Sequence, residues 1–242
     1  GDNVSMSKCK RVSFPIPSQR RPDRHAVDVW LVDLSAMPMP VAQGDSNPPG
    51  GSLHSPARDR RIRQRFFVRL LLARYLDQPG KDIQLSKDDN GKPHIVGESL
   101  AINLSHTRDW LAVAVGHSDP IGIDIELSRT LARVGRLARR CYPSQEAHAI
   151  VALDEPARSQ AFLQRWTKTE ALVKAQGERL ASALGSIRFS HPNQTLMHCP
   201  KDWVAPVNWS IQPLEFDAPL IAALASPEPI LSVRLNQVQW PQ

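Results

Sequence analysis

Strand-like stretches lie on both sides of a long helical region twice along this chain, and this repeat constrains the fold more than any other feature. The first half has these segments at residues 27–34, 58–77, 101–104 and 111–115, and the second half has them at 121–127, 131–177, 208–211 and 220–225. Because strands and helices bury their apolar faces against each other, the repeat predicts an α+β fold of two similar lobes.

Composition places the chain among ordinary globular proteins. Of its 242 residues, 41% are hydrophobic and 22% are charged, which excludes a chain that is disordered throughout. No apolar run approaches the ~18 residues that a membrane helix needs, so no membrane partner is expected. The first residues lack an apolar signal segment and the three cysteines are scattered, which predicts a cytoplasmic location.

Positive charge exceeds negative charge and is unevenly distributed. The formal net charge is +6. Residues 1–25 carry six basic and two acidic residues without helical or strand periodicity. We therefore expect a flexible basic arm at 1–25, followed by an N-terminal lobe at 26–120 and a C-terminal lobe at 121–242.

A second basic concentration lies in the helical segment 58–77. Within it, Ile62, Phe66, Leu70 and Ala73 recur at three- and four-residue steps, which predicts that they form the buried face. The arginines on the other faces either form a solvated surface or bind an anion such as phosphate, nucleic acid or an acidic protein. Charge alone does not decide between these alternatives.

The stretch Gly122-Ile-Asp-Ile-Glu126 is the most informative for chemistry. On a strand, alternate side chains share a face, so Ile123 and Ile125 are expected to point into a core while Asp124 and Glu126 point together to the other side. Two carboxylates that close repel each other unless a cation lies between them. The alternative is an edge strand with a solvated acidic face.

Two further stretches carry candidate functional side chains. Glu170 and Lys174 are four residues apart in a helical pattern, so they share a face and form either a surface ion pair or part of a site. Ser105 and His106 follow a strand, where they serve either as local hydrogen-bonding groups or as donors to a phosphate.

In their order and spacing, these stretches resemble the 4′-phosphopantetheinyl transferases of the monomeric, surfactin-synthetase-activating (Sfp) type. The resemblance covers about residues 26–235. It rests on Gly91-Lys-Pro93, Asn103-Leu-Ser-His106, Gly122-Ile-Asp-Ile-Glu126 and Trp166-Thr-x-x-Glu170-Ala-x-x-Lys174.

The resemblance implies a pseudo-duplicated fold of two α+β lobes with the active site at their junction. The implied reaction transfers 4′-phosphopantetheine from coenzyme A to a serine of an apo carrier protein and releases adenosine 3′,5′-bisphosphate. By similarity, Asp124, Glu126 and Glu170 would hold Mg²⁺, which prefers oxygen ligands and bridges substrate phosphates. Mn²⁺ would suit the same oxygens.

The resemblance also implies contacts with coenzyme A. Lys174 would reach the pyrophosphate, and His106 would contact a phosphate. The backbone of Gly91-Lys92-Pro93 would line the adenine. Arg60 and Arg61 fall where the family places contacts with the 3′-phosphate.

The proton acceptor and one basic residue are less clearly defined by the motifs. Glu146 lies where some family members have a candidate base for the serine proton, and Glu170 and a metal-bound water are rivals. Thr169 departs from the family pattern, which usually has a lysine before the glutamate, so one positive charge beside the phosphates is missing.

The expected partners are coenzyme A and an acidic apo carrier protein of the acyl, polyketide or peptidyl type. The protein itself is expected to be a monomer. A basic surface would steer an acidic partner. Two alternatives remain at this stage: a Mg²⁺-dependent hydrolase of nucleotides or nucleic acid, and a basic nucleic-acid-binding protein without enzymatic activity. No nucleic-acid partner is expected for the transferase, because unneutralised carboxylates repel phosphate.

Overall fold

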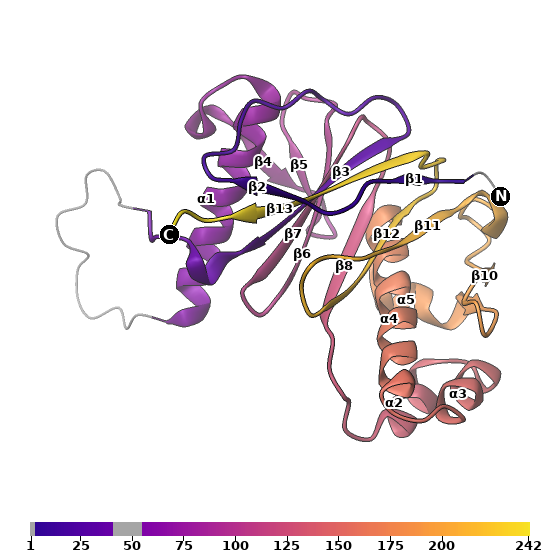
Figure 1. Cartoon of the computed structure of the whole chain (residues 1–242). Helices are drawn as coiled ribbons and strands as arrows, with labels where there is room; N and C mark the ends of the chain where they lie inside the picture. Colours follow the sequence, from indigo (N-terminus) through magenta and orange to yellow (C-terminus); the bar gives the residue numbers. More distant parts are fainter. Residues whose placement is uncertain (1–2, 41–54) are drawn as a thin grey trace.

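The computed structural model describes residues 3–40 and 55–242, and it has the α+β composition that the sequence predicts (Figure 1). The first sheet comprises β1 (Ser5–Met6), β2 (Lys10–Ser13), β3 (Ala26–Asp33), β6 (Ala101–Thr107), β7 (Trp110–Gly116) and β13 (Ser232–Gln239). The second comprises β8 (Gly122–Leu127), β11 (Ser210–Leu214) and β12 (Leu220–Ser226). Two small hairpins are formed by β4 (Leu85–Lys87) with β5 (Pro93–Ile95) and by β9 (Arg188–Phe189) with β10 (Leu196–His198).

The four longer α-helices lie in the two predicted helical segments, 58–77 and 131–177, to within two residues. Pro143 and Pro156 each precede a helix, because proline interrupts the helical hydrogen-bond pattern. The α-helices are α1 (Pro56–Leu76), α2 (Val134–Cys141), α3 (Ser144–Val151), α4 (Ala157–Gln176) and α5 (Leu180–Ala183), and the short 3-10 helices are η1 (Leu34–Ala36), η2 (Gly80–Asp82), η3 (Leu184–Ser186) and η4 (Pro206–Asn208).

The two halves of the chain share one topology. In the first, β3 is followed by α1 and then by β6 and β7, and the antiparallel strand order is β3-β7-β6. In the second, β8 is followed by α4 and then by β11 and β12, and the antiparallel order is β8-β12-β11. The last strand of each half therefore pairs between the first two, so the expected duplication is confirmed.

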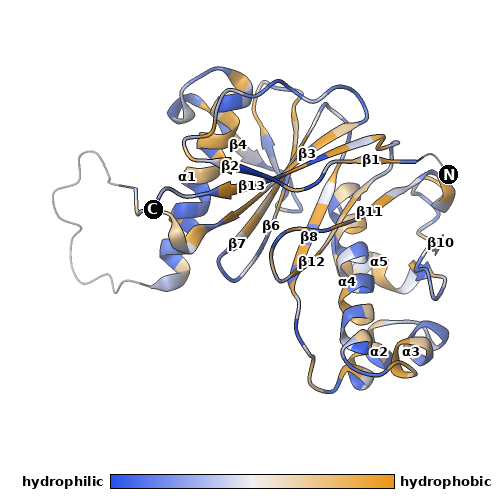
Figure 2. Ribbon diagram, viewed as in Figure 1, coloured by the Kyte–Doolittle hydropathy of each residue, from blue (hydrophilic) through white to orange (hydrophobic). Residues whose placement is uncertain are grey.

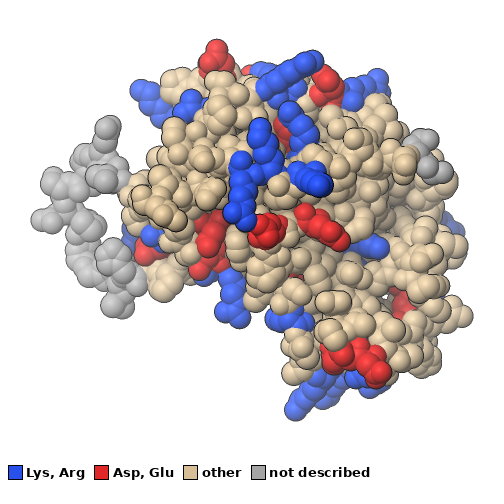
Figure 3. All heavy atoms as spheres, viewed as in Figure 1, with Lys and Arg blue, Asp and Glu red and all other residues tan. Residues whose placement is uncertain are grey.

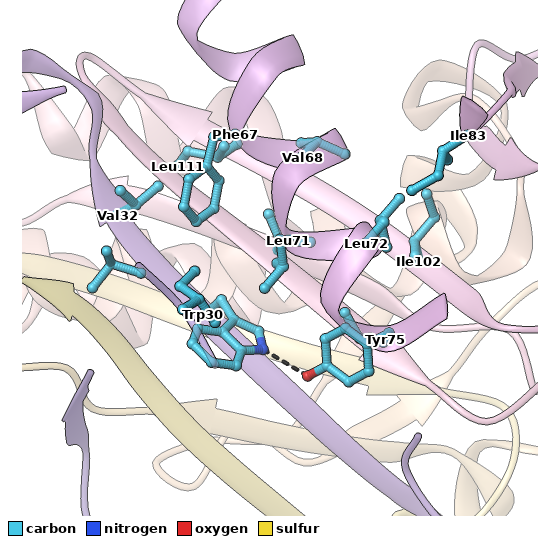
Figure 4. Close-up of a cluster of buried hydrophobic side chains, with 14 of the residues drawn as sticks. Trp30, Val32, Phe67, Val68, Leu71, Leu72, Tyr75, Ile83, Ile102 and Leu111 are labelled. Carbon is cyan, nitrogen blue, oxygen red and sulfur yellow. Dashed lines mark hydrogen bonds between the residues drawn. The ribbon is translucent and has the colours of Figure 1, made fainter. Parts of the chain in front are cut away.

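The two sheets pack face to face between α1 and α4 (Figure 1). Alternation on the first sheet directs large side chains such as Trp30 and Leu111 toward α1, while Ala112 and Ala114 face the second sheet. The strands are accordingly the most hydrophobic part of the ribbon, whereas the surface loops are mainly hydrophilic (Figure 2). In the α1 layer, the Trp30 indole N–H donates to the Tyr75 hydroxyl at 2.7 Å (Figure 4).

The buried face of α1 differs from the predicted one. Phe67, Leu71 and Tyr75 are buried against the sheet, whereas the predicted core residue Phe66 is 45% exposed (Figure 4). The helix has apolar residues at adjacent positions, so two faces about 100° apart both satisfy the helical spacing. Packing against the sheet selects the face that begins one residue later.

The predicted flexible arm at residues 1–25 is wrong for the described residues. Both β1 and β2 pair in parallel with β13, and Ile16 is buried in the first core. Short strands of two and four residues carry too little periodicity to be recognised in the sequence, and they form because β13 offers an unpaired edge.

The last strand of the predicted C-terminal lobe lies in the sheet of the N-terminal lobe. β13 pairs in parallel with β3 from Ser232↔Ala26 to Gln237↔Leu31. The boundary expected at residue 120 falls between β7 and β8, but β13 crosses back over it. Within the part of the chain that the structure describes, no helix combines the length and apolarity needed to cross a membrane.

Gly122 allows β8 to pack directly on α4. A Cβ atom at this position would lie 2.0 Å from the carbonyl oxygen of Ala171 and 2.5 Å from the backbone nitrogen of Ala175. Both neighbours are helix backbone, which cannot rotate away as a side chain can. The absence of a side chain at Gly122 therefore sets the spacing between the strand and the helix that carry the candidate carboxylates.

We expect Gly122→Ala to lower the free energy of unfolding by about 3 kcal/mol, because overpacking must separate β8 from α4. Gly185→Ala is the matched control, since no atom lies within 4 Å of its Cβ position and its φ is not positive. Urea unfolding followed by tryptophan fluorescence measures both variants. Equal stability of Gly122→Ala and the wild type would contradict the close approach.

Candidate active site

The alternation predicted for β8 is confirmed. Ile123 and Ile125 are buried in the core between the two sheets. Asp124 and Glu126 have the opposite strand parity and therefore point to the other face. On that side α4 brings Glu170 and Lys174 close enough to influence the pKa of Asp124. The carboxylates of the strand and of the helix thus share one electrostatic environment at the junction of the lobes.

Asp124 is the most unusual group in this environment. It is only 7% exposed, and its Oδ1 accepts hydrogen bonds from Ser105 Oγ and Lys174 Nζ, each at 3.2 Å. Its Oδ2 is buried and has no hydrogen-bond partner. Burial raises the pKa of Asp124 to about 7, opposed by Lys174 and reinforced by Glu170 and Glu126.

The other two candidate metal ligands are less buried. Burial raises the pKa of Glu170, with Lys174 opposing the shift and Glu126 adding to it. Glu126 Oε2 accepts a hydrogen bond from Arg129 Nη1 at 3.4 Å. In the described ranges 3–40 and 55–242, no three His, Cys, Asp or Glu side chains form a metal-binding group. The donor chemistry and the orphaned Asp124 Oδ2 fit a hard divalent cation, so the three-carboxylate ligand set stays a prediction.

Lys174 of α4 forms an ion pair with Asp124 of β8 and also contacts β6 of the first lobe. Its Nζ donates to the carbonyl oxygens of Leu104 at 3.3 Å and Ile123 at 2.9 Å, besides Asp124 Oδ1. A surface pair with Glu170 was the alternative suggested by the spacing, but the ion pair that the structure describes for Lys174 is with Asp124. A lysine that bonds β6, β8 and the buried carboxylate links both lobes.

His106 lies close to both Arg60 and Lys174. Partial burial lowers the pKa of His106, and the charges of Arg60 and Lys174 lower it further. Arg60 Nε also donates to Asp109 Oδ1 at 3.0 Å, which fixes the start of α1 to the β6–β7 turn. Arg61 is exposed on the next position of the helix. An anion bound here would reduce the repulsion between the cations.

The segment Gly91-Lys92-Pro93 leads from the turn of the β4–β5 hairpin into β5, which begins at Pro93. Gly91 has a φ of +83°, which a glycine adopts without strain. Lys92 Nζ donates to the carbonyl oxygens of Ile121 at 2.9 Å and Lys174 at 3.0 Å, so its side chain ties the hairpin to β8 and α4. Sequence reasoning considered only the backbone of this segment and did not predict this role for the lysine.

Glu146 has a different partner from the other carboxylates. It is buried on α3, where Arg165 Nε of α4 donates to its Oε1 at 2.5 Å. The Arg165 guanidinium lies 4.7 Å from the Tyr142 ring centroid and 4.3 Å from that of Phe189. The Glu146 carboxylate is therefore buried and ion-paired with Arg165.

Thr169, where the chain departs from the family motif, lies in the protein interior. It is fully buried and its hydroxyl donates to the Arg165 carbonyl at 2.9 Å, while Arg165 Nη1 bonds the same hydroxyl. The cation that contacts this position is Arg165, one helical turn earlier, and its charge is paired with Glu146. The sequence contains a signal for this contact, because Arg165 and Thr169 are four residues apart on one helix.

Comparisons with known proteins match the second half of the chain and extend into the first. A sequence profile of the 4′-phosphopantetheinyl transferase superfamily matches residues 120–223. The 4′-phosphopantetheinyl transferase HetI of Nostoc is 30% identical over 66% of this chain and 68% of its own length. The 4′-phosphopantetheinyl transferase Sfp of Bacillus subtilis is 29% identical over 55% of this chain and 60% of its own length. A Synechocystis protein named for the same activity is 28% identical, and the chain spans 54% of its length.

The raised pKa of Asp124 predicts that stability falls as pH rises in metal-free buffer. Between its ordinary pKa of 3.8 and about 7, the native state keeps the proton that the unfolded chain has lost. The free energy of unfolding should therefore decrease across this window, by at most about 1.4 kcal/mol per pH unit. Urea unfolding from pH 5 to pH 8 with a chelator should show a steeper decrease in the wild type than in Asp124→Asn. Parallel curves would contradict the shift.

The buried ion pair predicts a large effect of Arg165→Met. Removal of the arginine leaves the Glu146 charge buried without a partner, which should cost about 3–5 kcal/mol of unfolding free energy. The double variant Glu146→Gln/Arg165→Met should recover part of that loss. Arg129→Met is the control, because its pair with Glu126 is half exposed and should contribute less than ~1 kcal/mol. Similar losses for both single variants would refute the assignment.

Proposed function

Because the chain belongs to the 4′-phosphopantetheinyl transferase superfamily, we propose that it transfers 4′-phosphopantetheine from coenzyme A to a serine of an apo carrier protein. This membership confirms the family that the order of the motifs indicated. The chain spans 54%, 68% and 60% of the lengths of the Synechocystis, Nostoc and Bacillus relatives. We therefore propose their activity for this chain.

One observation carries the proposal. A buried aspartate with an unpartnered oxygen lies in the same electrostatic environment as Glu170 and Glu126, and Lys174, His106 and Arg60 are close by. Carboxylate oxygens suit a divalent cation, and the surrounding cations suit phosphates. A substrate with a metal-bound pyrophosphate satisfies both sets of groups, and coenzyme A is such a substrate.

In the proposed reaction, the serine oxygen attacks the β-phosphorus of coenzyme A. A phosphorus–oxygen bond forms to the serine, the bond within the pyrophosphate breaks, and adenosine 3′,5′-bisphosphate leaves with the electron pair. The serine proton passes to a base. Catalysis of this kind depends on positioning and on charge stabilisation.

We assign roles to the residues of this chain on that basis. Asp124, Glu126 and Glu170 would hold Mg²⁺ or Mn²⁺, which supplies positive charge to the phosphates when bound. His106 and Arg60, with Arg61 beside it, would bind phosphate groups.

Two further assignments concern the adenine and the serine proton. The backbone of Gly91-Lys92-Pro93 would line the adenine. Glu170, with its raised pKa, suits the role of proton acceptor better than Glu146, whose carboxylate is held by Arg165. Lys174 would act near the pyrophosphate while it fixes Asp124.

The carrier protein is proposed to be acidic. The net charge of +6 would steer an acidic partner toward the enzyme. Figure 3 shows lysine and arginine side chains gathered near the centre of one face, with acidic side chains beside them. We propose a cytoplasmic enzyme that acts as a monomer, and acyl, polyketide and peptidyl carriers are the candidate substrates.

The two alternative functions make different predictions. A Mg²⁺-dependent hydrolase would release phosphate or cleave nucleic acid without a carrier protein. A nucleic-acid-binding protein would bind DNA in a salt-sensitive manner that survives loss of the Asp124 carboxylate. Family membership favours the transferase over both.

The experiment that tests the proposal combines the protein with coenzyme A, Mg²⁺ and each class of apo carrier. Intact-protein mass spectrometry should show that the carrier gains the mass of one phosphopantetheinyl group. With a chelator present, the carrier should gain no mass. Asp124→Asn should slow transfer about 100-fold or more, since several kcal/mol of charge stabilisation are removed. Absence of transfer to every carrier class, with a correctly folded protein, would refute the proposed function.

A further inference from the structure

The backbone groups on the edge of β8 that faces β6 are hydrogen-bonded to side chains instead of to a neighbouring strand. The amide of Ile123 donates to Asn103 Oδ1 at 2.7 Å, and the amide of Ile125 donates to Ser105 Oγ at 3.1 Å. Asn103 and Ser105 lie on one face of β6, two residues apart. They take the places that backbone carbonyls of a neighbouring strand would occupy in a regular sheet.

The carbonyl groups on the same edge are also bonded by side chains. Lys92 Nζ donates to Ile121 O, and Lys174 Nζ donates to Ile123 O, each at 2.9 Å. The strand that carries Asp124 is therefore attached to the first lobe through the side chains of Asn103, Ser105 and Lys92. Lys174 of α4 adds a bridge, because its Nζ also donates to Leu104 O of β6. Backbone pairing of β8 in the described sheets is with β12 only.

Ser105 has a second contact that Asn103 lacks. Its hydroxyl accepts from the Ile125 amide and donates to Asp124 Oδ1 at 3.2 Å. A serine hydroxyl has a single proton, and here Asp124 receives it. Ser105 thus has no proton left to donate to a phosphate, and it is itself only 5% exposed.

The three protons of Lys174 are distributed in the same way. They are directed at Leu104 O, Ile123 O and Asp124 Oδ1. Oδ1 of Asp124 therefore receives both described hydrogen bonds, and Oδ2 receives none. Two donors on one oxygen fix the orientation of the carboxylate about its bond to Cβ.

We propose that Ser105 is a positioning residue for Asp124: it holds Oδ1 so that Oδ2 is the oxygen presented to a divalent cation. This inference rests on the metal site of the proposed function. It differs from the phosphate contact expected for Ser105 from the sequence. Hydrogen bonds to a ligating carboxylate tune metal affinity, and their loss weakens it by about 10- to 100-fold.

Asn103 provides the matched control for the test. Ser105→Ala and Asn103→Ala each leave one buried amide of β8 without its acceptor, so both should lower the unfolding free energy by about 1–3 kcal/mol. Only Ser105→Ala also removes the donor to Asp124. Ser105→Thr retains the hydroxyl that donates to Asp124 Oδ1, so it serves as the conservative variant.

Titration of the coenzyme A-free protein with Mn²⁺, followed by calorimetry, gives a readout independent of transfer. The dissociation constant for Mn²⁺ should rise about 10-fold in Ser105→Ala and change less than about twofold in Asn103→Ala and Ser105→Thr. Binding of coenzyme A in the presence of a chelator should be the same for Ser105→Ala and the wild type.

Three results would overturn the inference. They are unchanged Mn²⁺ affinity in Ser105→Ala, equal weakening in Ser105→Ala and Asn103→Ala, and metal-free loss of coenzyme A binding in Ser105→Ala. The last result would restore the phosphate contact. A wild-type protein that binds Mn²⁺ but modifies no carrier would contradict the proposed function and leave this inference intact.

Discussion

A carboxylate buried between two lobes governs the organisation of the site. Removing the Asp124 charge from water is costly, and Lys174 and Ser105 offset that cost at only one of its oxygens. The cost of burying this charge raises the pKa of Asp124. Because its Oδ2 has no hydrogen-bond partner, the carboxylate is also suited to bind a cation. The hydrogen bonds of Asp124 with Ser105 and Lys174 require β8 to lie close to β6 and to α4. Gly122 provides that approach on the α4 side, and Asn103 and Ser105 provide it on the β6 side.

Local periodicity was sufficient to predict much of this fold. The alternation on β8 and the long helices are properties of short segments, so they could be recognised without knowledge of tertiary contacts. The repeated topology followed from the order of those segments. The short N-terminal strands and the face of α1 were predicted wrongly because both depend on a distant partner. For α1, two adjacent apolar faces were compatible with the sequence, and packing on Trp30 and its neighbours decided between them.

The site was predictable to the extent that its residues share a strand or a helix. Asp124 with Glu126, and Glu170 with Lys174, could be grouped by spacing alone, and the family resemblance supplied the connection between the groups. The partners of Lys174 were not predictable, since they depend on how α4 and β6 pack against β8. The ion pair between Glu146 and Arg165 likewise joins two helices whose packing angle no local pattern specifies.

The position of β13 has a consequence for how this protein is made. The strand is inserted beside β3 and supports β1 and β2, although the chain between them includes the whole second sheet. During synthesis on the ribosome, β3 and β7 emerge long before β13 and leave one edge of the nascent sheet open. Completion of the first sheet must therefore wait until β13 has emerged, and a ribosome that stalls before residue 232 releases a sheet with an unpaired edge that can associate with other chains.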